Sequence, residues 1–284
     1  MELFISPRVA ALIELALEED EIGFDATSQA FFGAGSRASA RLIARQDLVM
    51  CGAPVAKAVF RRVDEAVRFE AVADEKVWVK KGEVIATVEG ASGSLLRGER
   101  TALNFLQRMC GIATLTREFV EALGDEETRV ADTRKTLPGW RLLDKYAVRC
   151  GGGYNHRYNL SGGVMIKENH IAAAGGIAEA IEVVRRHAPH TLRVEVEVET
   201  LKEVEEALEG GAEILLLDNM NNQMMKDAVR IIRDHRRGKE VVIEGSGNMD
   251  KERLRGLSEV GLDVVSVGAL THSVSAADIS MLID

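Results

Sequence analysis

The spacing of hydrophobic and polar residues changes along the N-terminal part of the chain. Apolar residues recur at helical spacing from Pro7 to about Glu19, which predicts a helix with Pro7 in its first turn. Residues 40–50, 67–73 and 76–90 have strand-like patterns, with Lys81-Gly82 as a hairpin turn, and residues 53–63 predict a helix between them. A long helical pattern follows from Ser94 to about Leu123, interrupted at Cys110-Gly111. The N-terminal part is therefore predicted to be an α+β domain.

Beyond residue 128, short apolar runs alternate with amphipathic helical segments. Six strands are predicted, centred near residues 129, 164, 195, 215, 242 and 265. Such alternation indicates repeated βα units on a parallel sheet, either a barrel or an open doubly wound sheet. Polar or glycine-rich loops follow nearly every strand rather than one switch point, and this distribution favours the barrel.

Composition narrows the class of protein. The chain has 284 residues, 46% of them hydrophobic and 29% charged, with a net charge of -9, so we expect a globular protein that does not bind nucleic acid. No apolar segment is long enough to cross a bilayer, and no membrane partner is expected. The three cysteines, at positions 51, 110 and 150, suit neither a disulfide framework nor a zinc motif, which favours a cytoplasmic location.

Positive charge is concentrated in one segment of this acidic chain. Residues 132–170 hold seven Lys or Arg residues and three acidic ones. Cations gathered on short loops repel one another unless an anion neutralises them. The segment therefore predicts a small ligand that carries several carboxylates or phosphates.

Two basic motifs in this segment are candidates for the anion site. Arg134 and Lys135 follow the first strand of the parallel series, where a guanidinium suits a carboxylate and an ammonium suits a phosphate. Three consecutive glycines, at 151 to 153, indicate a sharp turn or a close approach to a ligand, and His156 and Arg157 follow them. The alternatives are a solvated surface turn, a flexible linker and a structural histidine.

Lys167 and a set of carboxylates extend the candidate site. Lys167 ends a buried apolar run, so it is either an anion ligand or a Schiff-base nucleophile of the kind found in barrel aldolases. Glu195, Glu197 and Glu199 alternate along one strand and should share a face, and Asp218 ends the next strand. Glu197 and Asp218 could hold Mg²⁺ or sugar hydroxyls, with Glu195 paired to a buried Arg or Lys. A solvent-facing edge strand is the alternative.

Small residues follow the last two predicted strands. The loops 244–248 and 266–269 read EGSGN and SVGA, and both expose backbone N–H groups. Loops in this position of α/β barrels commonly bind a phosphate. The order of the two loops therefore predicts a phosphate cradle.

These motifs together resemble the quinolinate phosphoribosyltransferase family over nearly the whole chain. The resemblance rests on ERTALNFLQRMCGIAT (99–114), DTRKTLPG (132–139), KYAVRCGGGYNHR (145–157), IKENHI (166–171), VEVEVE (194–199), LLLDN (215–219), EGSGN (244–248) and SVGALTHS (266–273). It implies an α+β N-terminal domain over residues 1–108, joined by the C-terminal segment 274–284. An incomplete, seven-stranded α/β barrel would span residues 109–273. It also implies a homodimer with shared active sites, and leaves open whether dimers assemble further.

The resemblance also implies a reaction and a set of site residues. Quinolinate and phosphoribosyl pyrophosphate would react with Mg²⁺ to give nicotinate mononucleotide, pyrophosphate and CO₂ in NAD biosynthesis. Quinolinate would be bound by Arg134, His156, Arg157 and Lys167, with Arg100 from the partner subunit. Thr133 and Lys135 would bind substrate, Lys135 at the pyrophosphate, and Glu197 and Asp218 would serve the ribose and the metal, directly or through water. The 5′-phosphate would bind at Ser246, Gly247, Asn248, Gly268 and Ala269. The groups acting in catalysis would be Lys135, Lys167, Glu197 and Asp218.

Other functions are distinguished by chemistry. A related enzyme of molybdenum-uptake operons would differ in the Thr-Arg-Lys and Lys-Glu-Asn-His segments, and a nicotinate phosphoribosyltransferase would bind one carboxylate instead of two. A Lys167 aldolase would be trapped by borohydride, and a non-catalytic polyanion sensor would release no CO₂. Gly162-Gly163 and Gly245 depart from the family pattern and predict looser loops before Lys167 and before Ser246.

Overall fold

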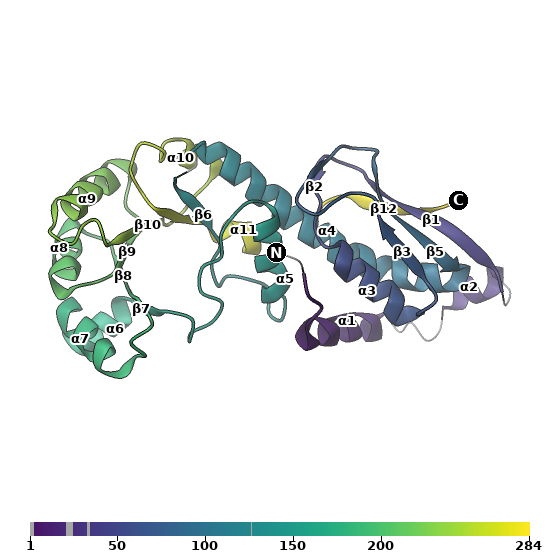
Figure 1. Ribbon diagram of the computed structural model, residues 1–284, viewed down its shortest axis with the longest axis horizontal. Helices are drawn as coiled ribbons and strands as arrows, with labels where there is room; N and C mark the ends of the chain where they lie inside the picture. Colours follow the sequence, from purple (N-terminus) through teal and green to yellow (C-terminus); the bar gives the residue numbers. More distant parts are fainter. Residues whose placement is uncertain (1–2, 21–24, 33–34, 126) are drawn as a thin grey trace. The chain divides into compact units, whose positions relative to one another are not determined.

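The chain forms two compact units in a computed structural model that describes residues 3–20, 25–32, 35–125 and 127–284. The first unit comprises Met1–Arg117, Thr136–Gly152 and Leu270–Asp284. The second comprises Glu118–Lys135 and Gly153–Ala269. Each unit has its own sheet (Figure 1).

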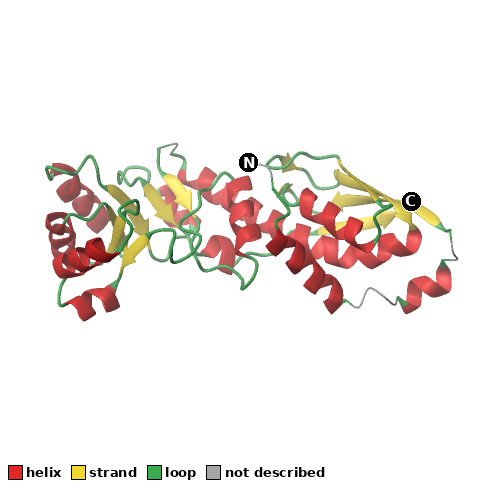
Figure 2. Cartoon of the chain, turned by 60° about the horizontal axis from the view of Figure 1, so that its bottom comes forward, coloured by secondary structure: helices red, strands yellow, loops and turns green. Residues whose placement is uncertain are grey.

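The first unit is built on an antiparallel sheet with the strand order β12-β1-β5-β3. Its strands are β1 (Arg37–Ala44), β3 (Arg68–Ala71), β5 (Val84–Ala91) and β12 (Ile279–Ile283), and a separate pair joins β2 (Leu48–Val49) to β4 (Trp78–Val79). Helices gather on one face of the sheet (Figure 2). The helices that begin in this unit are α1 (Pro7–Glu19), α2 (Ala26–Phe31), α3 (Ala53–Val63), α4 (Ser92–Leu123) and α5 (Arg141–Cys150). Because β12 pairs with β1, the C-terminal segment closes the edge of this sheet.

Local signals explain the helix starts of the first unit. Ser6 caps α1 by accepting the backbone N–H of Val9, and Pro7 occupies the first turn as predicted. Gly52 precedes α3 with a φ of 105°, and the Glu75 carboxylate accepts the backbone N–H groups of Gly52 and Ala53 at 2.9 Å. A carboxylate at a helix N-terminus satisfies donors that have no partner within the helix.

Two sequence predictions in this unit are wrong. Lys81-Gly82 is a turn, but β4 pairs with β2 while β5 pairs with β1 and β3, so it does not join a hairpin. Helix α4 runs through Cys110-Gly111 without a break. A Cβ at Gly111 would overlap the carbonyl oxygen of Ser275, so this glycine allows close backbone packing and does not end the helix.

The second unit is built on a parallel sheet with the strand order β6-β11-β10-β9-β8-β7. The strands are β6 (Arg129–Ala131), β7 (Val164–Ile166), β8 (Val194–Val198), β9 (Ile214–Asp218), β10 (Val242–Ser246) and β11 (Val264–Ser266). They alternate with α6 (Glu168–Ala174), α7 (Ile177–His187), α8 (Leu201–Gly210), α9 (Asn222–Asp234) and α10 (Lys251–Arg255), and α11 (Ala269–His272) follows β11. All six strands predicted from the sequence are present.

The strand order decides between the two architectures left open by the sequence. Each strand from β7 to β11 lies beside the next one in the chain, and β6 lies beside β11, so the order has no reversal of the doubly wound kind. Helices α7, α8 and α9 lie along one face of the sheet (Figure 1). Tyr154 forms a single parallel bridge with Ala131 in place of a full seventh strand. The unit is therefore an incomplete barrel.

Successive side chains of a strand point to opposite faces of the sheet, so one face of β8 packs in the core and the other carries the acidic residues. In β8, Val194, Val196 and Val198 are buried apolar residues, and Glu195 and Glu197 alternate with them on the opposite face. Strand β8 pairs with both β7 and β9, which excludes the predicted alternative of an edge strand. Gly245 lies within β10 and packs against Leu262, so it does not loosen a loop.

Candidate functional site

The predicted site residues of the second unit cluster at the carboxyl ends of its strands. Lys167 follows β7, Glu197 lies in β8, Asp218 ends β9 and Ser246 ends β10. Asp218 and Ser246 are register partners in adjacent strands. Thr133, Arg134 and Lys135 follow β6, and Gly268 and Ala269 follow β11. Because parallel strands end at one edge, residues far apart in sequence meet there.

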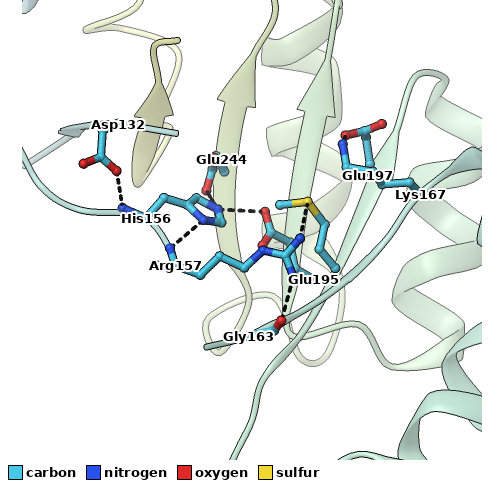
Figure 3. Close-up of polar contacts among 9 residues, drawn as sticks. Asp132, His156, Arg157, Gly163, Lys167, Glu195, Glu197 and Glu244 are labelled. Atoms are coloured by element: carbon cyan, nitrogen blue, oxygen red, sulfur yellow. Dashed lines mark hydrogen bonds and ion pairs between the residues drawn. The ribbon is translucent and has the colours of Figure 1, made fainter. Parts of the chain in front are cut away.

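Lys167 and Glu197 form an ion pair between neighbouring strands (Figure 3). The Lys167 side chain is 46% exposed, and the Glu197 side chain is 19% exposed. The backbone N–H of Lys167 also donates to Nδ1 of His170 at 3.0 Å, which fixes the start of α6. A half-exposed ammonium beside a carboxylate suits an anion ligand better than a desolvated Schiff-base nucleophile.

The loops after β9 and β10 hold each other in strained conformations. Asn219, Gly247 and Asn248 have positive φ angles of 55°, 95° and 45°. The Asn219 side chain donates to Asp218 Oδ2 at 2.8 Å, and its backbone N–H donates to the Ser246 carbonyl at 3.2 Å. A Cβ at Gly247 would overlap the Asn219 side chain, so glycine is required there. The loop backbone at Gly247 therefore has no side chain of its own to cover it.

Arg157 is held by the loop that precedes β7. Its Nη1 donates to the Gly163 carbonyl at 2.7 Å, and its backbone N–H donates to His156 Nδ1 at 2.8 Å (Figure 3). Partial burial lowers the pKa of the Arg157 guanidinium, and the nearby charge of Arg134 lowers it further. The two guanidiniums are both positive and repel each other, so they are suited to an anion that neutralises both.

A buried polar cluster lies beside Arg157 on the inner face of the sheet. His156 Nε2 is 3.4 Å from Glu195 Oε1 and 3.6 Å from Glu244 Oε2 (Figure 3). Both glutamate side chains are 5% exposed. Burial raises the pKa of Glu244 to about 7, and the charge of Glu195 raises it as well. The sequence predicted a buried Arg or Lys as the partner of Glu195. The charge of Glu195 opposes the lowering of the pKa of the part-buried Arg157 guanidinium, and His156 lies beside the same carboxyl group. These groups line part of a cavity of about 390 Å³.

Comparison with known proteins agrees with this geometry. Residues 112–282 match the model of the quinolinate phosphoribosyl transferase C-terminal domain, and residues 25–110 match that of the N-terminal domain. A probable nicotinate-nucleotide pyrophosphorylase (carboxylating) of Bacillus subtilis is 42% identical over 257 residues, covering 90% of this chain and 87% of that protein. The chain belongs to the quinolinate phosphoribosyltransferase family.

Solved structures of family members support the same assignment. The crystal structure of NadC from Streptococcus pyogenes has a TM-score of 0.94 and 40% identity, covering 100% of this chain and 99% of that one. Nicotinate-nucleotide pyrophosphorylase from Francisella tularensis has a TM-score of 0.89 and 35% identity, covering 98% of each chain. The predicted family and α/β class are confirmed. Human nicotinic acid phosphoribosyltransferase, at 14% identity and a TM-score of 0.63, covering 98% of this chain and 74% of that one, shares the fold alone.

The first unit holds other residues that the sequence placed near the site. Arg100 lies on α4 and lines a small cavity with Leu15 and Trp140. Three of the seven cations of the basic segment lie on α5: Arg141, Lys145 and Arg149. Gly151 ends this helix where a Cβ would overlap Ala113 and Thr116, so the first of the three glycines serves packing within the unit.

Three residues of the candidate site were not assigned roles from the sequence. Asp132 is fully buried and accepts the backbone N–H of His156 at 2.9 Å and Asn155 Nδ2 at 2.7 Å. Glu244 was read as part of a phosphate loop, but its side chain belongs to the buried cluster. Arg253 on α10 donates to the carbonyl oxygens of Gly247 and Met220. An acidic residue within an apolar strand or directly after one was a usable signal for the first two, whereas Arg253 had none.

Proposed function

We propose that this chain transfers the phosphoribosyl group of phosphoribosyl pyrophosphate to quinolinate with decarboxylation, in NAD biosynthesis. The activity is that of its family. The observation that supports this function best is the pairing of Lys167 with Glu197 at the strand ends, where an anion-binding charge meets a carboxylate. The site thus offers cations for two acidic substrates and carboxylates for a cationic transition state.

Quinolinate would bind between cations contributed by several loops. Arg134, Arg157 and Lys167 are suited to its two carboxylates, and His156 lies directly beside Arg157. Guanidiniums bind planar carboxylates through paired hydrogen bonds, which also orient the pyridine ring. We assign Arg100 to the site of a partner copy in a homodimer, which the family resemblance implies.

Phosphoribosyl pyrophosphate would lie across the ends of β8 to β11. Its 5′-phosphate fits the loops at Ser246, Gly247 and Asn248 and at Gly268 and Ala269, where backbone N–H groups can face the phosphate. Lys135, with Thr133 beside it, would bind the pyrophosphate. The Thr133 hydroxyl accepts the Lys135 backbone N–H at 3.0 Å, which gives this loop a fixed turn.

Glu197 and Asp218 fit a magnesium ion that is bound mainly by substrate. Mg²⁺ in phosphate enzymes takes one or two protein carboxylates and completes its shell with phosphate oxygens and water. In the described part of the chain, the clusters of three potential ligands are Cys51, Glu75 and Cys150, and His156, Glu195 and Glu244. Neither contains Glu197 or Asp218, so these two carboxylates would supply only part of a shell. When bound, Mg²⁺ would neutralise charge on the departing pyrophosphate.

The side chains at the site would stabilise charge and would not act as nucleophiles. As the bond to pyrophosphate breaks, positive charge develops at the ribose carbon, and Glu197 and Asp218 lie on the strands that would face it. The pyridine nitrogen then forms the new bond to this carbon. Loss of CO₂ leaves an electron pair beside the positive ring nitrogen, and that carbon takes up a proton. Arg134 and Arg157 would hold the ring in place throughout.

The cellular setting is proposed from the cysteine usage of the sequence. The described part of the chain has no helix with the length and apolar character needed to cross a membrane. Relatives include a chloroplastic form in rice and a mitochondrial form in Nicotiana glauca. We place this chain in the cytoplasm, as the sequence predicts.

One assay tests the proposed function. The protein is incubated with quinolinate, phosphoribosyl pyrophosphate and Mg²⁺, and nicotinate mononucleotide and CO₂ are measured, with nicotinate as the control substrate. We expect product from quinolinate and little or none from nicotinate. Ligand binding without CO₂ would indicate a polyanion sensor, and borohydride-dependent labelling of Lys167 would indicate a Schiff-base enzyme.

A further inference from the structure

Glu195 and Glu244, the two carboxyl groups that face His156, have no role in the proposed mechanism. The carboxyl groups of this cluster come from the inner faces of β8 and β10, and its imidazole comes from the segment that precedes Arg157. Burial of two neighbouring carboxyl groups is costly unless one of them is neutral. The charge of this cluster therefore depends on which of its groups carry protons.

The hydrogen bonds of His156 fix the position of its proton. The backbone N–H of Arg157 donates to Nδ1 at 2.8 Å, so Nδ1 is an acceptor and carries no hydrogen. In the neutral ring the proton is then on Nε2, which faces Glu195 and Glu244. A second proton on Nδ1 would point at the N–H of Arg157. In this tautomer Nε2 donates to Glu195 Oε1 at 3.4 Å, and Glu244 Oε2 lies 3.6 Å away.

The environment of Glu244 favours its protonated form. Burial and the charge of Glu195 on β8 raise its pKa, and these effects outweigh the lowering by His156 and by the Ser266 hydroxyl on β11. Its register partner on β9 is the apolar Leu216. Oε1 of Glu244 is buried and is the one buried side-chain oxygen or nitrogen in the described residues without a hydrogen-bond partner. An ionised oxygen in that position would lack both water and a donor, whereas a hydroxyl is far less costly.

We propose that Glu244 is a positioning residue that works as a neutral carboxylic acid and, together with Glu195, holds His156 in the Nε2–H tautomer. Because His156 Nδ1 accepts the backbone N–H of Arg157, this tautomer fixes the backbone from which the Arg157 guanidinium extends. The consequence for binding rests on the proposed function, in which Arg157 contacts quinolinate. Glu244 itself lies behind that contact and acts through His156.

A metal ion at the same three residues is the competing explanation. Their ligand atoms lie within 4.8 Å of one another, close enough to surround an ion. A metal would need the lone pair of Nε2, and the Nδ1 of a metal-bound histidine normally donates its hydrogen. Here Nδ1 accepts a hydrogen bond instead, so the geometry favours the proton over the metal.

Matched substitutions of Glu244 test the proposal in the full-length protein. Glu244→Gln keeps a neutral group of the same shape, so we expect quinolinate KM and kcat near pH 6.5 to stay within about threefold of the parent. Glu244→Ala removes one of the two carboxyl groups that face Nε2 and leaves space beside the ring, and we expect quinolinate KM to rise about tenfold or more while the KM for phosphoribosyl pyrophosphate is unchanged. In the parent, quinolinate KM should rise above about pH 7 as Glu244 ionises, and Glu244→Gln should abolish that rise.

A spectroscopic readout separates this proposal from the proposed function. ¹⁵N NMR of the histidine rings, assigned with a His156→Gln variant, should show the Nε2–H tautomer for His156 near neutral pH, and Glu244→Ala should perturb it. The tautomer can be observed even if the protein does not convert quinolinate. Three results would each overturn the proposal. The first is an imidazolium signal for His156, and the second is an equal loss of quinolinate binding in Glu244→Gln and Glu244→Ala. The third is a stoichiometric metal that is lost in Glu244→Gln.

Discussion

The guanidinium of Arg253 donates to the carbonyl oxygen of Gly247 and thereby links helix α10 to the loop after β10. The same side chain donates to the Met220 carbonyl in the loop after β9. One arginine therefore holds the two loops whose residues Asn219, Gly247 and Asn248 have positive φ angles. A strained backbone persists only where its surroundings fix it.

Replacing Arg253 with Met should weaken the binding of phosphoribosyl pyrophosphate. Two charge-assisted hydrogen bonds to loop carbonyls would be lost, and we expect the KM for phosphoribosyl pyrophosphate to rise about tenfold or more with little change in quinolinate KM. Arg255→Met is the matched control, because Arg255 is an exposed residue of the same helix. Steady-state kinetics with each substrate varied in turn would measure the difference. Equal effects of the two variants would contradict a role for Arg253 in holding the loops.

Mixed dimers should reveal whether Arg100 serves the site of a partner copy. Arg100→Ala and Lys167→Ala should each be nearly inactive alone. After the two variants are mixed and allowed to exchange subunits, we expect about a quarter of the parent activity, since half of the dimers are mixed and each has one intact site. The measurement is activity after exchange, with size-exclusion chromatography to establish the dimer. No recovery in dimers shown to have exchanged would place Arg100 in the site of its own chain.

Gly111→Ala should destabilise the first unit even though alanine favours a helix. Helix propensity alone would stabilise the variant by about 1 kcal/mol. A Cβ at this position would overlap the Ser275 carbonyl, and backbone cannot move aside as a flexible side chain can, so we expect a net loss of about 2 kcal/mol or more. Gly93→Ala in the same helix meets no atom within 4 Å and is the control. Thermal unfolding should show a lower Tm for Gly111→Ala alone.

Stability should fall as pH rises through the range in which Glu244 ionises. Burial raises the pKa of Glu244 in the folded chain from 4.5 to about 7, so between these values the unfolded chain releases this proton while the folded chain keeps it. The contribution of the group is complete below pH 4.5 and is lost as pH rises toward about 7, by at most about 1.4 kcal/mol per pH unit. Urea unfolding at several pH values should show a shallower slope in Glu244→Gln. An unchanged slope would mean that Glu244 is already ionised in the folded chain.

The sequence by itself determined the element types, the family and the order of the site motifs. The spacing of apolar residues predicted α1 and α3 and all six parallel strands, because periodicity is a local property. Residue types such as Arg134, Lys167 and Asp218 predicted an anion site at the strand ends, because chemistry and position after a strand can both be read along the chain. The glycine at 111 was misread as a break because the atom that requires it, the Ser275 oxygen, lies far away in sequence.

Only the tertiary structure decided which side chains meet. Lys81-Gly82 looked like a hairpin turn, but strand pairing is a long-range choice, and β4 and β5 pair with different strands. Glu195 was expected to pair with a cation, and its charge does act on Arg157, but the chain also brings His156 and Glu244 from two other segments to the same buried point. Which groups of this cluster carry protons depends on their burial and on the distances between them, and both are set only when the chain folds.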